Sequence, residues 1–119
     1  MQVFRSAATQ NNIPLALTIG NFDGVHLGHQ AMLERLKQDA KRLNIATCIM
    51  IFEPHPREFL TPSQSPNRLT SLREKLEMFA ALDIDRVQVC QFNHRFAQIS
   101  AQTFITDILM HQLNVHWML

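Results

Sequence analysis

Two histidines stand three positions apart in a glycine-rich stretch that directly follows an apolar run. The run Leu15–Ile19 predicts a buried strand, and the turn residues from Gly20 onward lead into an amphipathic helix. At the start of that helix His26 and His29 share a face, and Gly28 between them has no side chain to block a ligand. A helix start also offers unpaired backbone N–H groups and a partial positive charge. These residues therefore predict a cradle for phosphate groups.

Two other interpretations of the histidine pair compete with a phosphate cradle. The same spacing at a helix start is typical of a solvated surface, or of half a metal site. The surrounding residues favour a functional site, because Asp23, Gly24, Gly28 and both histidines lie within seven positions. A purely structural turn does not need so many specialised groups.

The element that must position the histidines is the helix itself, which we expect to extend to about Leu43 and to end at Asn44. Its predicted apolar stripe consists of Met32, Leu33, Leu36, Ala40 and Leu43. The continuously apolar stretch Ile45 to Phe52 then predicts a strand buried on both faces of a parallel sheet. The histidines thus belong to the turn of a β-α-β unit.

A proline-rich segment, Glu53 to Asn67, follows this strand, and no helix or interior strand continues through its four prolines. Long loops within compact domains are usually functional, which makes this one a candidate flap over a substrate; a surface excursion is the alternative. Beyond it, Ser71 to Glu74 forms a capping box that begins a helix to about Leu82. The predicted buried face of that helix consists of Leu72, Leu76 and Phe79.

Three further strands and a last helix complete the expected fold. Gln2 to Arg5 predicts a short first strand, and Val115 to Leu119 predicts a final one. Arg86 to Phe92 predicts a strand that alternates between its two faces, and Ser100 caps a helix after it. The alternating positions of that strand are Val87, Val89 and Gln91.

Strands that alternate with helices favour an α/β fold, an open parallel sheet with right-handed crossovers and helices on both faces. In such sheets ligands bind beyond the carboxyl ends of the strands. The loops after Ile19 and Phe52 both lie there. Function is therefore expected at that edge of the sheet.

The composition limits the partners to expect. The 119 residues make one domain, with 46% hydrophobic and 18% charged residues. A net charge of +1 gives no electrostatic reason to expect nucleic acid or a membrane surface. No apolar run approaches the roughly 18 residues that span a bilayer, and Met1 to Arg5 lacks the apolar core of a signal peptide. We expect a cytoplasmic protein.

The remaining thiols and imidazoles are predicted to be structural or uninvolved. Cys48 and Cys90 lie far apart in apolar stretches, which favours reduced core thiols over a disulfide or a metal pair. The histidines His94, His111 and His116 share no spacing that suggests a site.

The eleven residues Gly20 to Gln30 resemble the opening motif of the bacterial FAD synthetases, the bifunctional riboflavin kinase/FMN adenylyltransferases. Within them, His26-Leu27-Gly28-His29 resembles the less specific His-x-Gly-His signature of the nucleotidylyltransferase superfamily. The resemblance covers nearly the whole chain after about Ile13. It continues through the segments Phe52–Pro56, Leu69–Leu82 and Phe92–Leu109.

This resemblance implies a Rossmann-like fold and an enzyme that transfers AMP from MgATP to FMN, giving FAD and pyrophosphate. It implies that His26 and His29 are catalytic residues that contact the ATP phosphates. Phe22 is either a ligand contact or a core residue that ends the strand. The implied ATP-binding set is Gly20, Phe22, Asp23, Gly24, His26, Gly28 and His29.

The resemblance also implies that the loop after Phe52 forms the flavin side of the site. An aromatic ring and a rigid proline pair suit a flat tricyclic ring, and Arg57 suits its phosphate; a solvated Arg57 and a His55 that only fills a turn are the alternatives. The implied flavin-binding set is Pro54, His55, Pro56, Arg57 and Phe59. No protein ligand set for a metal is predicted.

The later motifs of the family and its riboflavin kinase domain have no counterpart in residues 1–119, so we expect a partial FMN adenylyltransferase domain. The expected partners are ATP, FMN and, in a longer parent, riboflavin. Self-association is expected through the apolar residues His116 to Leu119. Two alternatives are a nucleotidylyltransferase with another phosphorylated acceptor and a noncatalytic module that holds a nucleotide or flavin.

Overall fold

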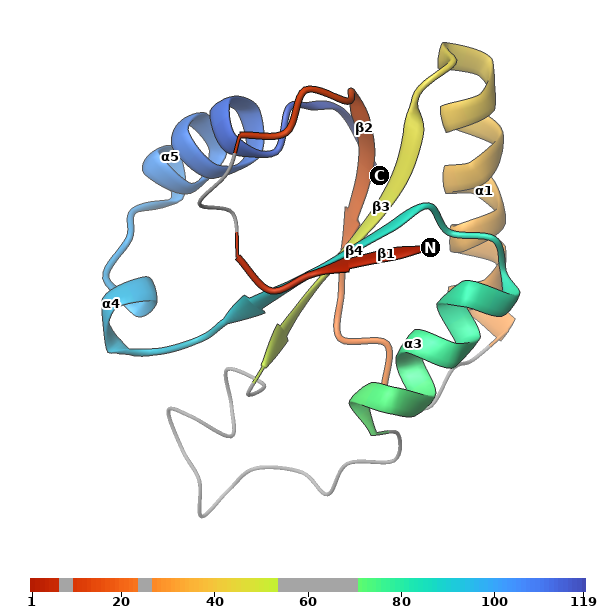
Figure 1. The fold of residues 1–119 in the computed structure, drawn as a ribbon, viewed down its shortest axis with the longest axis horizontal. Helices are drawn as coiled ribbons and strands as arrows, with labels where there is room; N and C mark the ends of the chain where they lie inside the picture. The colour runs from red at the N-terminus through yellow and green to blue at the C-terminus, as the bar shows by residue number, and fades with distance from the viewer. Residues whose placement is uncertain (7–9, 24–26, 54–70) are drawn as a thin grey trace.

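A computed structural model describes residues 1–6, 10–23, 27–53 and 71–119, and its described strands form one sheet (Figure 1). The strands are β1 (Gln2–Phe4), β2 (Leu15–Ile19), β3 (Ala46–Glu53), β4 (Arg86–Gln91) and β5 (Val115–Met118). The helices are α1 (Leu27–Leu43), α3 (Leu72–Ala81), α4 (His94–Ala97), α5 (Ala101–Thr103) and the π-helical η2 (Phe104–Gln112).

The sheet is parallel throughout, with the order β1-β4-β3-β2-β5. From β2 the chain adds β3 and β4 on one side and then returns to place β5 on the other side. The growth of the sheet therefore reverses at β2, and in open α/β sheets ligands bind beyond the carboxyl ends of the strands at this switch point. The predicted α/β fold is confirmed, and its topology directs attention to the end of β2.

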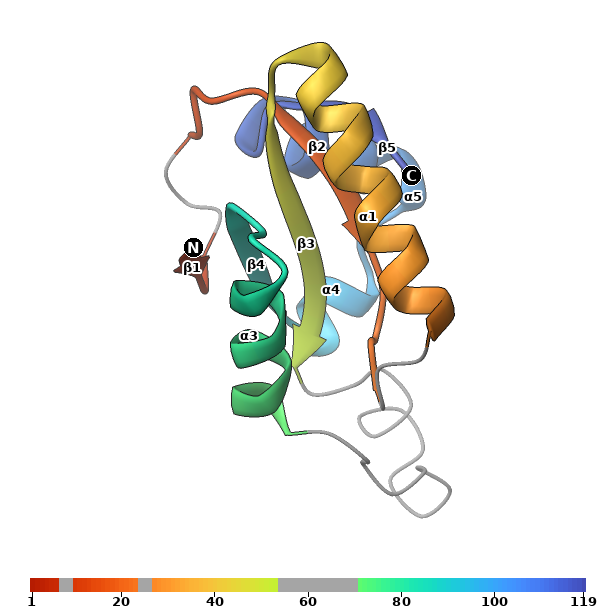
Figure 2. The ribbon, with the colours of Figure 1, turned by 90° about the vertical axis from the view of Figure 1, so that its right-hand side faces the viewer.

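Helices cover both faces of the sheet, as predicted (Figure 2). On one face Leu33 of α1 and Phe79 of α3 pack against Ile49 and Val87. On the other face Leu109 of η2 packs in a cluster with Leu17, Met50 and Cys90, among others. Because each face buries its own apolar cluster, β2 and β3 are apolar along most of their length.

Local capping residues set where the helices end. Asn44, Asp83 and Asn114 have φ angles of 56°, 60° and 59°, and each lies between a helix and the strand that follows it. Asn and Asp adopt this left-handed conformation more readily than other residues that have a side chain. The chain therefore changes direction there at a small cost in conformational energy. Ser71 and Glu74 form the predicted capping box of α3, with Ser71 Oγ 3.1 Å from the Glu74 backbone nitrogen.

Two sequence predictions about burial were wrong. The alternation predicted for β4 is absent, because Arg86 to Cys90 are all buried, including Gln88 at 1% exposure. β4 lies between β1 and β3, and both of its faces are covered. Leu43 was placed on the buried stripe but is 39% exposed. Leu43 is the last residue of α1, directly before the chain turns away at Asn44.

The two cysteines are free and buried, as predicted. Burial raises the pKa of the Cys48 thiol from its ordinary value of 9.0 to about 12, and that of Cys90 to about 11. A thiol that stays protonated in the folded chain while the unfolded chain ionises opposes stability at high pH. Both cysteines are therefore inert packing residues near neutral pH.

We expect the free energy of unfolding to be constant near pH 8 and to fall as the pH rises above 9, through the raised pKa values of Cys48 and Cys90. Each thiol contributes a slope of up to about 1.4 kcal/mol per pH unit, because the unfolded state loses the proton first. Urea unfolding between pH 8 and about pH 10.5 measures this slope.

The matched control is the C48A/C90A variant, which keeps the lysines but lacks both thiols. The chain contains no tyrosine, so no phenol ionises in this range. An equal slope in this variant and in the unmodified chain would show that the buried thiols do not cause the loss.

Candidate phosphate-binding site

The carboxyl end of β2 leads into Gly20, the first residue of the segment between β2 and α1. Its backbone nitrogen donates a hydrogen bond to the Met50 carbonyl oxygen over 3.2 Å, which continues the pairing of β2 with β3. A Cβ built on Gly20 would lie 2.6 Å from Cε2 of Phe22, closer than real Cβ contacts come. Only glycine therefore lets the Phe22 ring fold back over the end of the strand.

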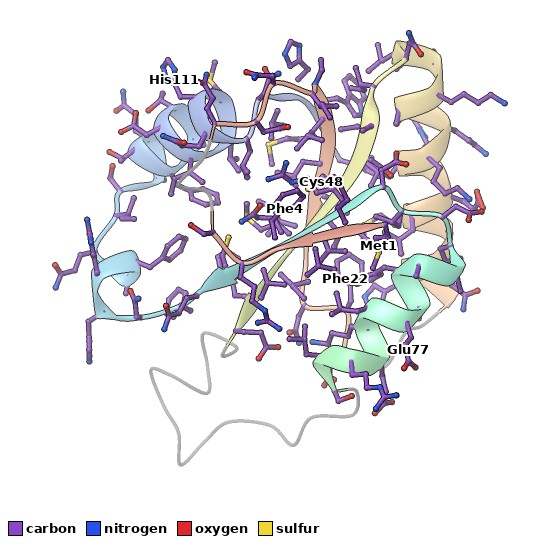
Figure 3. The ribbon with its side chains drawn as sticks, in the orientation of Figure 1. Met1, Phe4, Phe22, Cys48, Glu77 and His111 are labelled. Carbon is purple, nitrogen blue, oxygen red and sulfur yellow. The ribbon has the colours of Figure 1, made fainter. Side chains whose placement is uncertain are left out.

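Phe22 has a φ of 56°, a left-handed conformation that is unusual for a bulky side chain. Its ring is 2% exposed and packs edge-on against Phe79, with centroids 5.3 Å apart and an interplanar angle of 86°. Figure 3 shows the ring pointing toward the layer between the sheet and α3. Of the two roles predicted for Phe22, the structure supports the core residue, because a buried ring does not present its face to a ligand.

His29 lies in the first turn of α1, directly beyond this core. Its ring is half-buried, with its centroid 5.2 Å from that of Phe22 and an interplanar angle of 58°. Contact with the buried Phe22 ring thus orients the imidazole of His29. One position earlier, Gly28 is exposed, and a Cβ built there would meet no atom within 4 Å. The packing of the described residues therefore does not require glycine at position 28. The space that a side chain would occupy there is open to a ligand beside His29.

The structure brings five of the predicted ATP-binding residues to the turn after β2 and the first turn of α1. These are Gly20, Phe22, Asp23, Gly28 and His29. Gly24 and His26 lie outside the described residues, so the predicted sharing of one ligand by the two histidines stays a prediction. The whole predicted flavin-binding set also lies outside them, namely Pro54, His55, Pro56, Arg57 and Phe59.

Four phenylalanines cluster where β3 and β4 end. Phe52 and Phe92 meet edge-on at 6.1 Å between ring centroids, and Phe96 lies 5.4 Å from Phe52 and 5.6 Å from Phe92. Phe104 joins them 5.8 Å from Phe96. All four rings are half-buried.

No sequence prediction joined these four phenylalanines into one cluster. The signal present in the sequence was that two predicted strands both end in phenylalanine, at Phe52 and Phe92; the structure pairs these strands. Their assembly creates an aromatic surface at the carboxyl edge, directly before the loop proposed to contact flavin.

Other histidines of the described chain lie elsewhere. His94 is in α4, His111 in η2 and His116 in β5, and all three are exposed; Figure 3 shows His111 on the outer surface of its helix. Among the described residues, no group of three or more His, Cys, Asp or Glu side chains is arranged to hold a metal ion. The same residues include no helix with the length and apolarity to cross a membrane.

The model of one protein family, described as FAD synthetase, matches residues 8–119. The chain belongs to the FAD synthetase family. Bifunctional riboflavin kinase/FMN adenylyltransferase of Escherichia coli is 45% identical over 102 residues, covering 86% of this chain and 33% of that protein. The Haemophilus influenzae protein of the same name is 40% identical over 120 residues, covering 99% of this chain and 39% of its own length.

This FAD synthetase family chain thus spans about a third of the length of the curated relatives it matches. A solved structure titled macrolide-efflux protein, from Streptococcus pneumoniae, superimposes with a TM-score of 0.79 and covers 98% of this chain and 45% of that chain. At 17% identity this likeness shows only that the two share a fold.

Proposed function

We propose that this chain forms the ATP-binding part of an FMN adenylyltransferase, which makes FAD in riboflavin metabolism. A single observation carries the proposal. Half-buried His29 is oriented by the buried Phe22 ring in the first turn of α1, beside the carboxyl end of the strand at which the sheet reverses. The family match makes FMN the acceptor that fits best, ahead of another phosphorylated acceptor.

In the proposed reaction a phosphate oxygen of FMN attacks the α-phosphorus of ATP. The bond between the α-phosphorus and the bridging oxygen breaks, pyrophosphate leaves and FAD forms. Negative charge accumulates on the phosphate oxygens in the transition state, so the protein must mainly position the two phosphates and stabilise charge. No protein nucleophile is required.

His29 and the N-terminus of α1 suit that task. The first N–H groups of a helix have no partner within the helix and carry a partial positive charge, which attracts phosphate. We propose that His29 donates a hydrogen bond to a phosphate oxygen there, and that His26 acts with it. The open space at Gly28 lets the phosphates approach the helix backbone closely.

Magnesium supplies further charge neutralisation on the ATP phosphates when it is bound. It prefers phosphate oxygens and water to a cage made only of protein ligands. The residues at the site therefore suit ATP that arrives with its own magnesium.

The flavin end is proposed to lie where β3 and β4 end. Phe52 comes two residues before the first of the predicted flavin-binding residues in the sequence, and its half-buried ring meets that of Phe92. Aromatic rings and prolines there suit the flat flavin ring. Cytoplasmic location is part of the same proposal, because ATP and FMN are supplied there.

Self-association along β5 is also part of the proposal. β5 is an edge strand of the described sheet, and Met118 and Leu119 beside it are 48% and 43% exposed. Met118 belongs to β5 and Leu119 follows it directly, and an edge strand with exposed apolar side chains favours pairing with a second chain.

Calorimetric titration of the 119-residue chain with MgATP and, separately, with FMN tests the proposal. We expect MgATP to bind, and H29A to weaken that binding about tenfold or more, the loss of one charge-assisted hydrogen bond. FMN affinity is expected to change little in H29A.

H111A is the matched control, because it removes an exposed imidazole on the far helix η2. Equal weakening by H111A and H29A would show a general effect of charge. Failure of a folded chain to bind either ligand would overturn the assignment of the site to this chain.

A further inference from the structure

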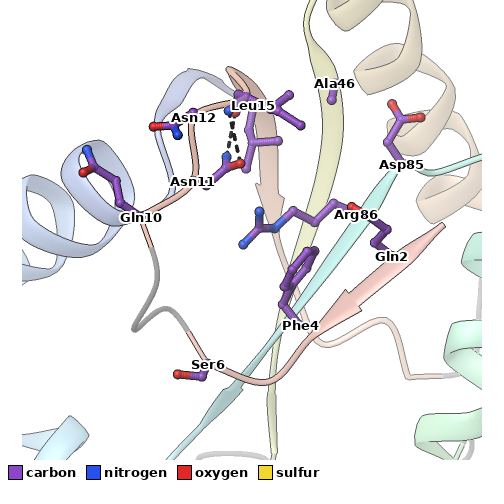
Figure 4. Close-up of a pocket in the computed structure, with 11 residues that line it drawn as sticks. Gln2, Phe4, Ser6, Gln10, Asn11, Asn12, Leu15, Ala46, Asp85 and Arg86 are labelled. Atoms are coloured by element: carbon purple, nitrogen blue, oxygen red, sulfur yellow. Dashed lines mark hydrogen bonds between the residues drawn. The ribbon is translucent and has the colours of Figure 1, made fainter.

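A cavity lies at the amino ends of the strands, at the other end of the sheet from the candidate phosphate site, and Figure 4 shows residues that line it. Its volume is about 840 Å³, and the first residues of β1, β2, β3 and β4 all contribute to its wall. It therefore sits at the amino ends of the strands, whereas His29 follows the carboxyl end of β2. The residues that matter for the argument are Phe4, Asn12, Ile13, Leu15, Asp85 and Arg86.

Among the residues that line the cavity, Arg86 is unusual because it is a buried cation. It is the first residue of β4 and only 7% exposed, and its Cζ lies 3.9 Å from the centroid of the Phe4 ring. Its Nη2 donates a hydrogen bond to Oε1 of Gln88 over 2.9 Å. Its Nε is buried without a hydrogen-bond partner among the described residues. A guanidinium has five N–H donors, so this one is poorly satisfied.

The described residues give this cation no counter-ion. No carboxylate lies within salt-bridge distance of Arg86 among them, although Asp85 is its neighbour in sequence. Oδ2 of Asp85 instead accepts hydrogen bonds from the backbone nitrogen and Oγ1 of Thr47, at 2.9 and 3.1 Å. Burial lowers the pKa of Arg86 from its ordinary value. A buried cation without a counter-ion is costly, and such a group is retained where something else neutralises it.

The rest of the cavity suits an organic ligand. Ile13, which is 58% exposed, contributes apolar surface, while Asn12 offers an exposed polar side chain. In Figure 4 the guanidinium extends from β4 across the Phe4 ring toward the segment that carries Asn11 and Asn12. Asn11 holds that segment in place, since its Nδ2 donates to the carbonyl oxygens of Ile13 and Leu113 over 2.6 and 2.8 Å.

We propose that this cavity binds a small organic anion, with a carboxylate or phosphate group on Arg86 and an apolar body against Ile13. The Phe4 ring supports the guanidinium from one side. A planar guanidinium can form paired hydrogen bonds with either a carboxylate or a phosphate. The site is separate from the proposed ATP site, and neither proposal depends on the other.

The test is a nuclear magnetic resonance titration of the 119-residue chain with benzoate, phenyl phosphate and inorganic phosphate as probes. We expect at least one organic anion to shift the Arg86 Nε–H resonance and the amides of residues 12–15 in a saturable way. Inorganic phosphate, which lacks an apolar body, should bind at least threefold more weakly than phenyl phosphate. Equal affinity of these two would overturn the proposed role of Ile13.

The variant R86M should weaken binding of the organic anion at least tenfold. The matched control is R5Q, which removes an exposed arginine next to β1 that does not line the cavity. Unchanged affinity in R86M, or equal weakening in R5Q, would overturn the proposal. The Arg86 Nε–H resonance of the unmodified chain decides the matter even if R86M does not fold. If that resonance is unmoved by all three probes at roughly 10 mM, the proposal is wrong.

Discussion

Replacing Gly20 by alanine should lower the free energy of unfolding by about 1–3 kcal/mol, the usual cost of forcing an extra methyl into a packed site. The new Cβ would stand 2.6 Å from Cε2 of Phe22. The ring has little room to move aside, because it is 2% exposed and packs against Phe79. Urea unfolding at pH 7 measures the loss.

Gly28→Ala is the matched control for this prediction. It adds the same methyl group eight positions later, where no atom of the described residues packs within 4 Å of the built Cβ. We expect G28A to be as stable as the unmodified chain or slightly more stable, because alanine favours a helix over glycine. Equal destabilisation by both variants would mean that contact with Phe22 is not what requires glycine at position 20.

The same variant should also affect ligand binding. If the Phe22 ring moves, the imidazole that rests on it at 5.2 Å moves as well. G20A is therefore expected to bind MgATP more weakly even under conditions where it is fully folded. Weakened binding in a folded G20A would identify Phe22 as a positioning residue for His29.

His29→Ala should reduce FAD formation at least 10²-fold, the usual effect of removing one preorganised donor to transition-state charge. The suitable protein is a chimera in which this chain replaces the matched segment of the Escherichia coli relative, which is 45% identical over 102 residues. FAD formation from FMN and MgATP measures the effect as kcat/KM.

Riboflavin phosphorylation by the chimera provides an internal control for folding. The name of the Escherichia coli protein includes riboflavin kinase. Phosphorylation of riboflavin by the same preparation therefore shows that the part of the chimera taken from that protein is folded. H29A should lower FAD formation and leave riboflavin phosphorylation unchanged, and H111A should leave both unchanged. An H29A chimera that forms FAD at the normal rate would exclude His29 from the reaction.

Local sequence signals predicted the elements around the site well. The apolar run before Gly20 forms β2, Asn44 ends α1, and Ser71 caps α3. These features depend on backbone conformation and on hydrogen bonds between residues a few positions apart. Side-chain chemistry within a short window is sufficient to specify them.

The same signals predicted where the candidate site lies. An apolar strand followed by a turn and a helix places His29 at a helix N-terminus, and the structure has this arrangement. The sequence left the role of Phe22 open, because a phenylalanine after a strand packs equally well against a core or a ligand. Its burial depends on Phe79, 57 positions away, and local pattern does not predict that meeting.

By itself, the sequence determined the β-α-β unit, its caps and the position of the histidine motif, since these follow from residues close together in the chain. The tertiary structure alone decided that β1 pairs with β4, which stacks Arg86 on Phe4 and buries it at the amino edge of the sheet. It also decided that β4 is buried on both faces, against the alternation in its sequence. Both results depend on strand order, and strand order is set by packing between segments far apart in the chain.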